Sequence, residues 1–235
     1  MRQATPPLDD PGLRVVASFE ALMATPFRDG VNAVCWPRDL PGDFDEVAQK
    51  LGTADDVATI DDAQLRSLDV SPAGGQARAA LLEDLGRLRA IGAAPTLDCV
   101  RRYPRDRHGL VATDVHSFHV DSATTPVDTF LCSYAGASTE GLRNHEARRR
   151  VDVPAIRAQL LESWGGVKGE AFDAWLGENC FDLHYEPLPS ARPFSFGLGN
   201  LWRIAVQYPG CPVPACIHRA PEDSPGRPPR LLLIS

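Results

Sequence analysis

Apolar residues recur at helical spacing in three stretches of the chain. Residues 76–91 carry four leucines on one helical stripe and are followed by Gly92, so the pattern predicts a helix that ends there. A shorter helix is expected from Asp43, whose carboxylate can cap the first turn, to Gly52. Helical character returns over residues 154–177, where a proline suits the first turn.

Other stretches alternate apolar and polar residues as strands do. Residues 31–36 read as a strand closed by Pro37. Residues 111–121 alternate with a period of two, and Asp128–Ala135 is expected to follow as a strand after a short turn that contains Pro126. Further short strands, separated by glycine and proline, are expected at residues 181–185, 200–208, 215–219 and 230–234.

Several short strands at this spacing favour a sandwich or barrel. The expected fold class is α+β, in a single domain that covers residues 1–235. Residues 1–110 form a mainly helical N-terminal lobe in this interpretation. Residues 111–235 form a strand-rich core, with a helical insertion at about 154–177.

Composition adds limits on partners and location. The 235 residues include 31 acidic and 24 basic side chains, a net charge of −7, which argues against a nucleic-acid-binding face. An apolar signal core and a membrane-spanning stretch are both missing from the sequence, so a cytoplasmic location with no membrane partner is expected. In that reducing compartment the six cysteines are not expected to form a disulfide framework.

The segment 113–121 carries the strongest candidate chemistry. His119 and Asp121 are two residues apart, so on a strand they share one face and can converge on one ion. A His-x-Asp pair is the strand-borne part of a facial triad of two histidines and one carboxylate, which leaves three positions free on octahedral Fe(II). His218, at the end of another expected strand, is the best candidate for the third ligand.

An arginine follows in a suitable order. Arg230 opens an apolar strand twelve residues after His218, and its planar guanidinium can bind a carboxylate through two hydrogen bonds. Arg227 competes for this role. Residues 113–235 thereby resemble the iron(II)- and 2-oxoglutarate-dependent dioxygenases. The resemblance implies a double-stranded β-helix (jelly-roll or cupin-like) core, Fe(II) and 2-oxoglutarate as cofactors, and Arg230 as the carboxylate clamp.

The resemblance extends to the strand after the motif. Asp128–Ala135 resembles the next core strand of that fold, and its hydroxyls, among them those of Thr129 and Tyr134, are expected to help bind the cosubstrate. The substrate would be an unknown small molecule or protein.

A second resemblance concerns the whole chain. The phrases Gly-Val-Asn-Ala-Val-Cys-Trp-Pro-Arg (30–38), Ser-Phe-His-Val-Asp (117–121), Gly-Asn-Leu-Trp-Arg-Ile-Ala (199–205) and Cys-Ile-His-Arg-Ala-Pro (216–221) are similar to a bacterial family catalogued as domain of unknown function 1826. That resemblance implies an association with zinc homeostasis and with a metallochaperone partner, because members often lie beside metallochaperone GTPase genes.

Two alternatives stay open at this point. Cys211, Cys216 and His218 could bind Zn(II) as a tetrahedral site, in which case the protein would be a non-catalytic zinc-binding protein of metal homeostasis. The histidines could equally be structural, with no metal bound. His116 is expected to face away from His119, and the pattern does not decide the role of His184.

Overall fold

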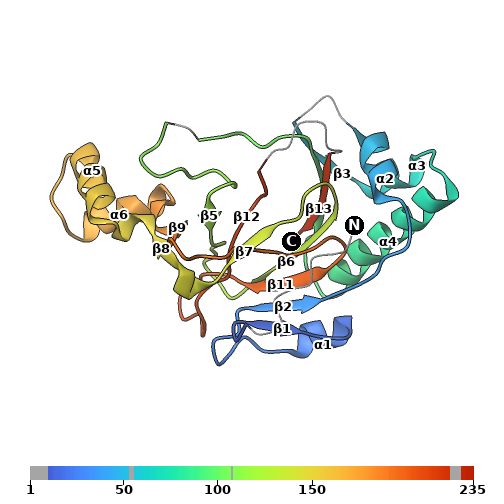
Figure 1. The fold of residues 1–235 in the computed structure, drawn as a ribbon, viewed down its shortest axis with the longest axis horizontal. Coiled ribbons are helices and arrows are strands. Elements are labelled where there is room, and N and C mark those ends of the chain that lie inside the picture. Colours follow the sequence, from blue (N-terminus) through green and yellow to red (C-terminus); the bar gives the residue numbers. More distant parts are fainter. Residues whose placement is uncertain (1–9, 53–55, 107, 223–228) are drawn as a thin grey trace.

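The computed structural model describes residues 10–52, 56–106, 108–222 and 229–235. Within these ranges it contains six α-helices and two β-sheets, so the expected α+β class is confirmed (Figure 1). No helix in the described ranges has the length and apolar character needed to cross a membrane.

The larger sheet has seven strands in the order β1-β2-β11-β6-β13-β4-β3. Its pairs are antiparallel except for β1 and β2, which run parallel, so the sheet is mixed. The strands are β1 (Leu13–Val15), β2 (Ala33–Trp36), β3 (Val57–Ile60), β4 (Thr96–Val100), β6 (Asp128–Ala135), β11 (Leu201–Ala205) and β13 (Arg230–Ile234).

The smaller sheet is antiparallel throughout and has the order β10-β7-β12-β5-β9-β8. Its strands are β5 (Phe118–His119), β7 (Glu140–Leu142), β8 (Ala147–Arg149), β9 (His184–Pro187), β10 (Phe194–Ser195) and β12 (Ile217–Arg219). Three 3₁₀ turns accompany it: η1 (Asn144–Glu146), η2 (Arg150–Asp152) and η3 (Phe181–Leu183).

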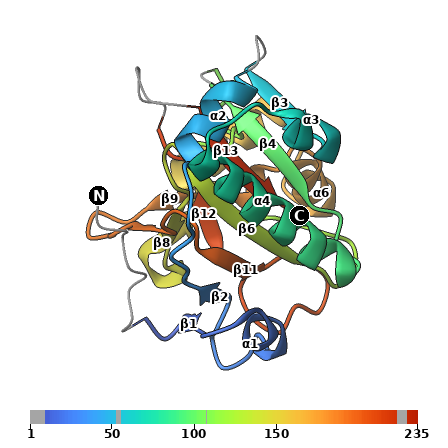
Figure 2. The same ribbon diagram turned by 90° about the vertical axis from the view of Figure 1, so that its right-hand side faces the viewer.

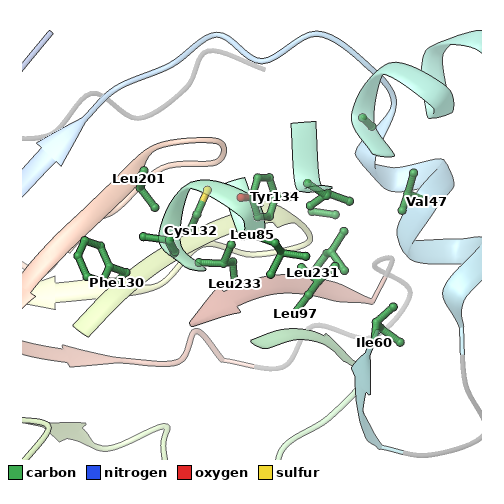
Figure 3. Close-up of a cluster of buried hydrophobic side chains, with 14 of the residues drawn as sticks. Val47, Ile60, Leu85, Leu97, Phe130, Cys132, Tyr134, Leu201, Leu231 and Leu233 are labelled. Carbon is green, nitrogen blue, oxygen red and sulfur yellow. The ribbon is translucent and has the colours of Figure 1, made fainter. Parts of the chain in front are cut away.

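Four helices cover the outer face of the larger sheet: α1 (Phe19–Ala24), α2 (Phe44–Leu51), α3 (Asp62–Ser67) and α4 (Pro72–Ala90). Figure 2 looks onto this face, with α4 lying across the strands. Buried leucines of α4, Leu85 among them, pack on Cys132, Leu231 and Leu233 of the sheet (Figure 3). Because α2 begins after Asp43, whose carboxylate accepts from the Glu46 amide, and ends at Gly52, both expected boundaries are confirmed.

The other face of the larger sheet packs against the smaller sheet. Side chains from both sheets fill this layer, including Leu131, Trp202 and Leu232 of the larger sheet and Cys216 next to β12. Strand β13 shows the alternation directly, because Leu231 and Leu233 face the helices while Leu232 faces the smaller sheet. Arg230 has the same parity as Leu232, so it enters the layer between the sheets.

The expected helical insertion consists of two helices. α5 (Pro154–Trp164) ends at Gly165, which has a φ of 77° that favours glycine, and α6 (Glu170–Glu178) follows. The two helices share their own small core around Leu160, Phe172 and Leu176.

Two expectations about strands are wrong. The strand expected over residues 111–121 is reduced to Phe118–His119, because the carboxylates of Asp106 and Asp114 accept hydrogen bonds from backbone amides and hold the preceding residues as a loop. The N-terminal lobe also contains more strand than its pattern indicates, since β1 to β4 all belong to the larger sheet.

A buried ion pair joins α4 to the strands. Arg38 donates to Asp84 at 2.6 Å, and Asp84 also accepts from the Tyr134 hydroxyl at 2.6 Å. The Tyr134 ring stacks on Phe44 among the helix-facing residues. Tyr134 therefore lies on the opposite face of β6 from the smaller sheet, and its expected role in cosubstrate binding is not supported.

The Tyr134→Phe variant tests this structural role. Loss of one buried hydrogen bond should lower the free energy of unfolding by about 1–2 kcal/mol, measured by urea denaturation. Asp84→Asn should cost more, about 3–5 kcal/mol, because it leaves the Arg38 charge buried without its carboxylate. Metal affinity should stay unchanged in Tyr134→Phe, and a reduced affinity would contradict the assignment of this residue to the helix-facing core.

Candidate metal centre

Three neighbouring strands of the smaller sheet bring histidines into one row. His119 of β5 lies directly opposite His218 of β12 on one side and His184 of β9 on the other. Residues paired directly in an antiparallel ladder project from the same face of the sheet. The strand pairing, rather than the sequence, thus joins His119 to a residue almost one hundred positions later.

Asp121 completes a set of three ligand atoms with His119 and His218. One atom from each residue lies within 4.8 Å of the other two, and the His218 Nε2 to Asp121 Oδ1 distance is 3.7 Å. Ligands about 2.1 Å from one ion and at right angles to each other are about 3 Å apart. Small side-chain rotations therefore suffice to bring these atoms to one cation.

The hydrogen bonds of both histidines leave the same nitrogen free for a ligand. His119 Nδ1 contacts the Ser117 carbonyl at 2.8 Å, and His218 Nδ1 contacts the Cys216 carbonyl at 3.2 Å. A carbonyl only accepts, so each Nδ1 carries a proton, and in a neutral imidazole the Nε2 then presents a lone pair. Burial, together with the neighbouring His218, lowers the pKa of His119 to about 4, which keeps its imidazole neutral near pH 7.

A threonine from the opposite sheet holds the carboxylate. The Thr129 hydroxyl of β6 donates to Asp121 Oδ2 at 2.7 Å, which leaves Oδ1 on the side of His218. Thr129 was expected to bind cosubstrate, whereas its hydrogen bond orients the carboxylate. Two nitrogens and one carboxylate oxygen, each oriented by a second partner, suit Fe(II) and other divalent cations with open positions.

The role of His184 becomes clear from its partner. Its Nδ1 pairs with the Ser117 hydroxyl, and its ring centre is 5.7 Å from that of His119, so it supports the row without joining the set of ligand atoms. Burial lowers the pKa of His184. His116 is buried beside Tyr103, with its Nδ1 near the Pro221 carbonyl.

Arg230 is a buried cation surrounded by hydroxyl groups. Its guanidinium, in a side chain of which 8% is exposed, donates to Thr139 at 2.5 Å, to Ser133 at 3.3 Å and to Tyr103 at 3.5 Å. Its Nε has no hydrogen-bond partner among the described residues, and no described carboxylate forms an ion pair with it. Burial lowers the pKa of this guanidinium, as expected for a desolvated cation.

Strand register fixes where Arg230 lies relative to the triad. The pairing of Arg219 with Glu140, continued by one residue, places Thr139 opposite Ala220, two residues beyond His218. Two residues of strand span about 6.6 Å. Thr139, which the Arg230 guanidinium contacts, is therefore one such step along the strand from the row of histidines, and Arg230 lies in the same layer between the sheets.

The alternative zinc set is not brought together. Cys211 Sγ contacts the carbonyls of Val206 and Val213 at 3.2 and 3.0 Å, while Cys216 is buried in the layer between the sheets. Within the described ranges, the set of three ligand atoms comprises His119, Asp121 and His218 and includes neither cysteine. Arg227, the competitor of Arg230, lies outside the described residues.

Comparisons with known proteins bear on neither resemblance. No family model, no curated protein and no solved structure matches the chain. Both family resemblances therefore remain predictions, and the functional argument depends on the geometry of the site.

Asp121 and its threonine partner should both determine metal affinity. Asp121→Ala should abolish binding of one equivalent of Co(II), measured by competition with a chromophoric chelator. Thr129→Val should weaken binding about 10- to 100-fold, as is typical when the partner of a ligand is removed.

Thr59→Val is the matched control, because the Thr59 hydroxyl also donates to a cross-strand aspartate, Asp98, at 2.7 Å but on the β3–β4 pair. Equal effects of the two threonine substitutions on metal affinity would contradict the assigned role of Thr129.

Proposed function

We propose that the protein is a non-haem iron(II)- and 2-oxoglutarate-dependent oxygenase that acts on a small molecule. The triad of His119, Asp121 and His218 would hold the metal and leave three coordination positions open. Arg230 would bind the distal carboxylate of 2-oxoglutarate. The two facing sheets would correspond to the double-stranded β-helix, with the site in the layer between them.

The buried guanidinium of Arg230 is the observation that carries this proposal. A buried charge is normally paired with an opposite charge, because desolvation of an isolated ion costs several kcal/mol. Around Arg230, the described residues supply hydroxyls but no carboxylate. A carboxylate ligand would complete the ion pair and also satisfy Nε through a two-pronged hydrogen bond.

The register supports a ligand that reaches from the triad toward Arg230. One two-residue step, about 6.6 Å along β12, separates the row of His218 from the row of Thr139. A five-carbon dicarboxylate with a 2-oxo group can chelate a metal at one end and meet the guanidinium at the other.

Each residue would have a defined task. Ser117 and Cys216 hold the Nδ1 protons of the two histidines, Thr129 orients Asp121, and Thr139 and Ser133 fix the plane of the Arg230 guanidinium. When bound, Fe(II) and 2-oxoglutarate supply the oxidising chemistry that no side chain of this chain provides.

A non-catalytic zinc site is the second candidate function, because the donor set is also compatible with Zn(II). Two imidazoles and one carboxylate also bind Zn(II) in proteins. In that case the metal would be retained as zinc and Arg230 would bind no dicarboxylate. Metal analysis of protein from cells and binding of 2-oxoglutarate to the Fe(II)-loaded protein separate the two candidates.

Arg230→Met should remove cosubstrate binding without harming the fold. Loss of a charge-assisted hydrogen-bonded pair predicts a 2-oxoglutarate affinity reduced by about 30- to 1,000-fold, equivalent to about 2–4 kcal/mol. The free energy of unfolding without ligand should stay equal or rise, because an uncompensated buried charge is replaced by an apolar side chain. Isothermal titration under nitrogen and urea denaturation measure the two quantities.

The control is Arg203→Met, which removes another buried arginine. Its guanidinium already contacts the Met23 carbonyl and lies 3.6 Å from the Asp128 carboxylate, so we expect lost stability with unchanged 2-oxoglutarate affinity. If the Fe(II)-loaded wild-type protein neither binds 2-oxoglutarate nor converts it to succinate in air, the proposed function is wrong.

A further inference from the structure

A cleft of about 350 Å³ reaches Cys216, two residues before His218 of the triad. Its walls come from residues 10–13 before and within β1, from residues 142–145 at the end of β7 and after it, and from Phe194. Cys216, directly before β12, also lines it. A volume near the lower end of the range for small-ligand sites, about 300–1,000 Å³, suits a metabolite.

The register of β12 relates this cleft to the proposed metal. Cys216, His218 and Ala220 follow one another at intervals of two, so they share the face that looks into the layer between the sheets. Because His218 pairs with His119 in an antiparallel ladder, Cys216 and Asp121 lie on the same side of the row of histidines. The cleft therefore lies on the side of the triad opposite to Arg230, which is bonded near Ala220.

Two side-chain oxygens in the cleft are acceptors on largely buried residues. Asn32, of which 6% is exposed, uses its Nδ2 for the Asn144 Oδ1 at 2.7 Å and the Pro214 carbonyl at 3.0 Å, which fixes its Oδ1 as an acceptor. Among the described residues, none donates to that oxygen. Asp10 is 8% exposed, and its Oδ1 accepts the Gly12 amide at 2.8 Å while its Oδ2 meets Arg143 Nε at 2.5 Å.

The two oxygens converge over Gly12. A Cβ added at Gly12 would lie 3.3 Å from Asp10 Oδ1 and 3.5 Å from Asn32 Oδ1. Both oxygens thus border the space that any side chain at this position would occupy. Oxygen acceptors are suited to a ligand group that donates several hydrogen bonds. With Asp10 paired to Arg143, the second carboxylate of the lining, Asp29, gives the cleft a negative charge that favours a cationic group.

We propose that this cleft binds the protonated amino group of a small organic molecule. Asp10 Oδ1 and Asn32 Oδ1 accept its hydrogen bonds, and the apolar body of the ligand packs on Leu13, Leu142 and Phe194. We also assign this amine as the substrate that is oxidised. This assignment rests on the proposed function, since it requires the metal at the triad.

Ligand-observed NMR on the metal-free protein tests the binding site alone. The probe n-butylammonium should bind, whereas butyrate, which has a similar size and the opposite charge, should not. Gly12→Ala keeps every polar group but fills the space between the oxygens, and it should weaken amine binding at least tenfold. Equal affinity for butyrate, or unchanged amine binding in Gly12→Ala, would overturn the proposal.

Gly75→Ala is the matched control, because a Cβ added at Gly75 on α4 meets no atom within 4 Å. It should leave amine binding unchanged. Asp10→Asn should also weaken binding at least tenfold, and thermal melts of each variant show that the fold is retained. Gly12→Ala needs no unusual backbone angle, since Gly12 is not among the residues with positive φ.

Paramagnetic relaxation connects the amine to the metal. With Mn(II) loaded, the protons of bound n-butylammonium should relax faster in the wild-type protein and not in Asp121→Ala. Amine binding without such relaxation, in protein that has bound Mn(II), would overturn the substrate assignment. Failure of Mn(II) to bind at all would overturn the proposed function and with it the substrate assignment, while the NMR result on metal-free protein decides the cleft separately.

Discussion

The direct pairing of His119 with His218 is the constraint on which the site depends. A shift of this register by one residue would turn one imidazole to the other face of the smaller sheet and separate the ligand atoms. Strand β5 has only two residues, so the ladder alone fixes the register weakly. The loop carboxylates of Asp106 and Asp114 before β5 and the Thr129 hydrogen bond to Asp121 after it hold the segment from both ends.

A second constraint is the charge of Arg230. Its burial without a carboxylate partner among the described residues lowers stability rather than raising it, so packing gives no reason for a guanidinium at this position. By contrast, Arg38 and Asp84 form a buried pair that satisfies both charges and fastens α4 to the larger sheet. The difference between these two arginines separates a group that supports the fold from one that is suited to a ligand.

The local sequence pattern predicts the features that depend only on residues close together in the chain. The boundaries of β6 and the caps of α2 follow from alternation and from Asp43, and the shared face of His119 and Asp121 follows from their spacing. Residues on one strand share a face only when they are an even number of positions apart. Tyr134 and Thr129 are five residues apart, so they cannot both face the site. Ser133 has the parity of Thr129 and contacts Arg230, a signal that the sequence contained. The places of Thr139, Tyr103 and His184 depend on register between distant strands, which no local pattern encodes.

X-ray absorption spectroscopy of the Fe(II)-loaded protein tests the central claim most directly. The triad predicts a first shell of nitrogen and oxygen only, with the multiple-scattering signature of two imidazoles, and a change in that shell when 2-oxoglutarate is added. A sulfur neighbour at about 2.3 Å, the usual metal–thiolate distance, or a signature of fewer than two imidazoles would contradict a site formed by His119, Asp121 and His218.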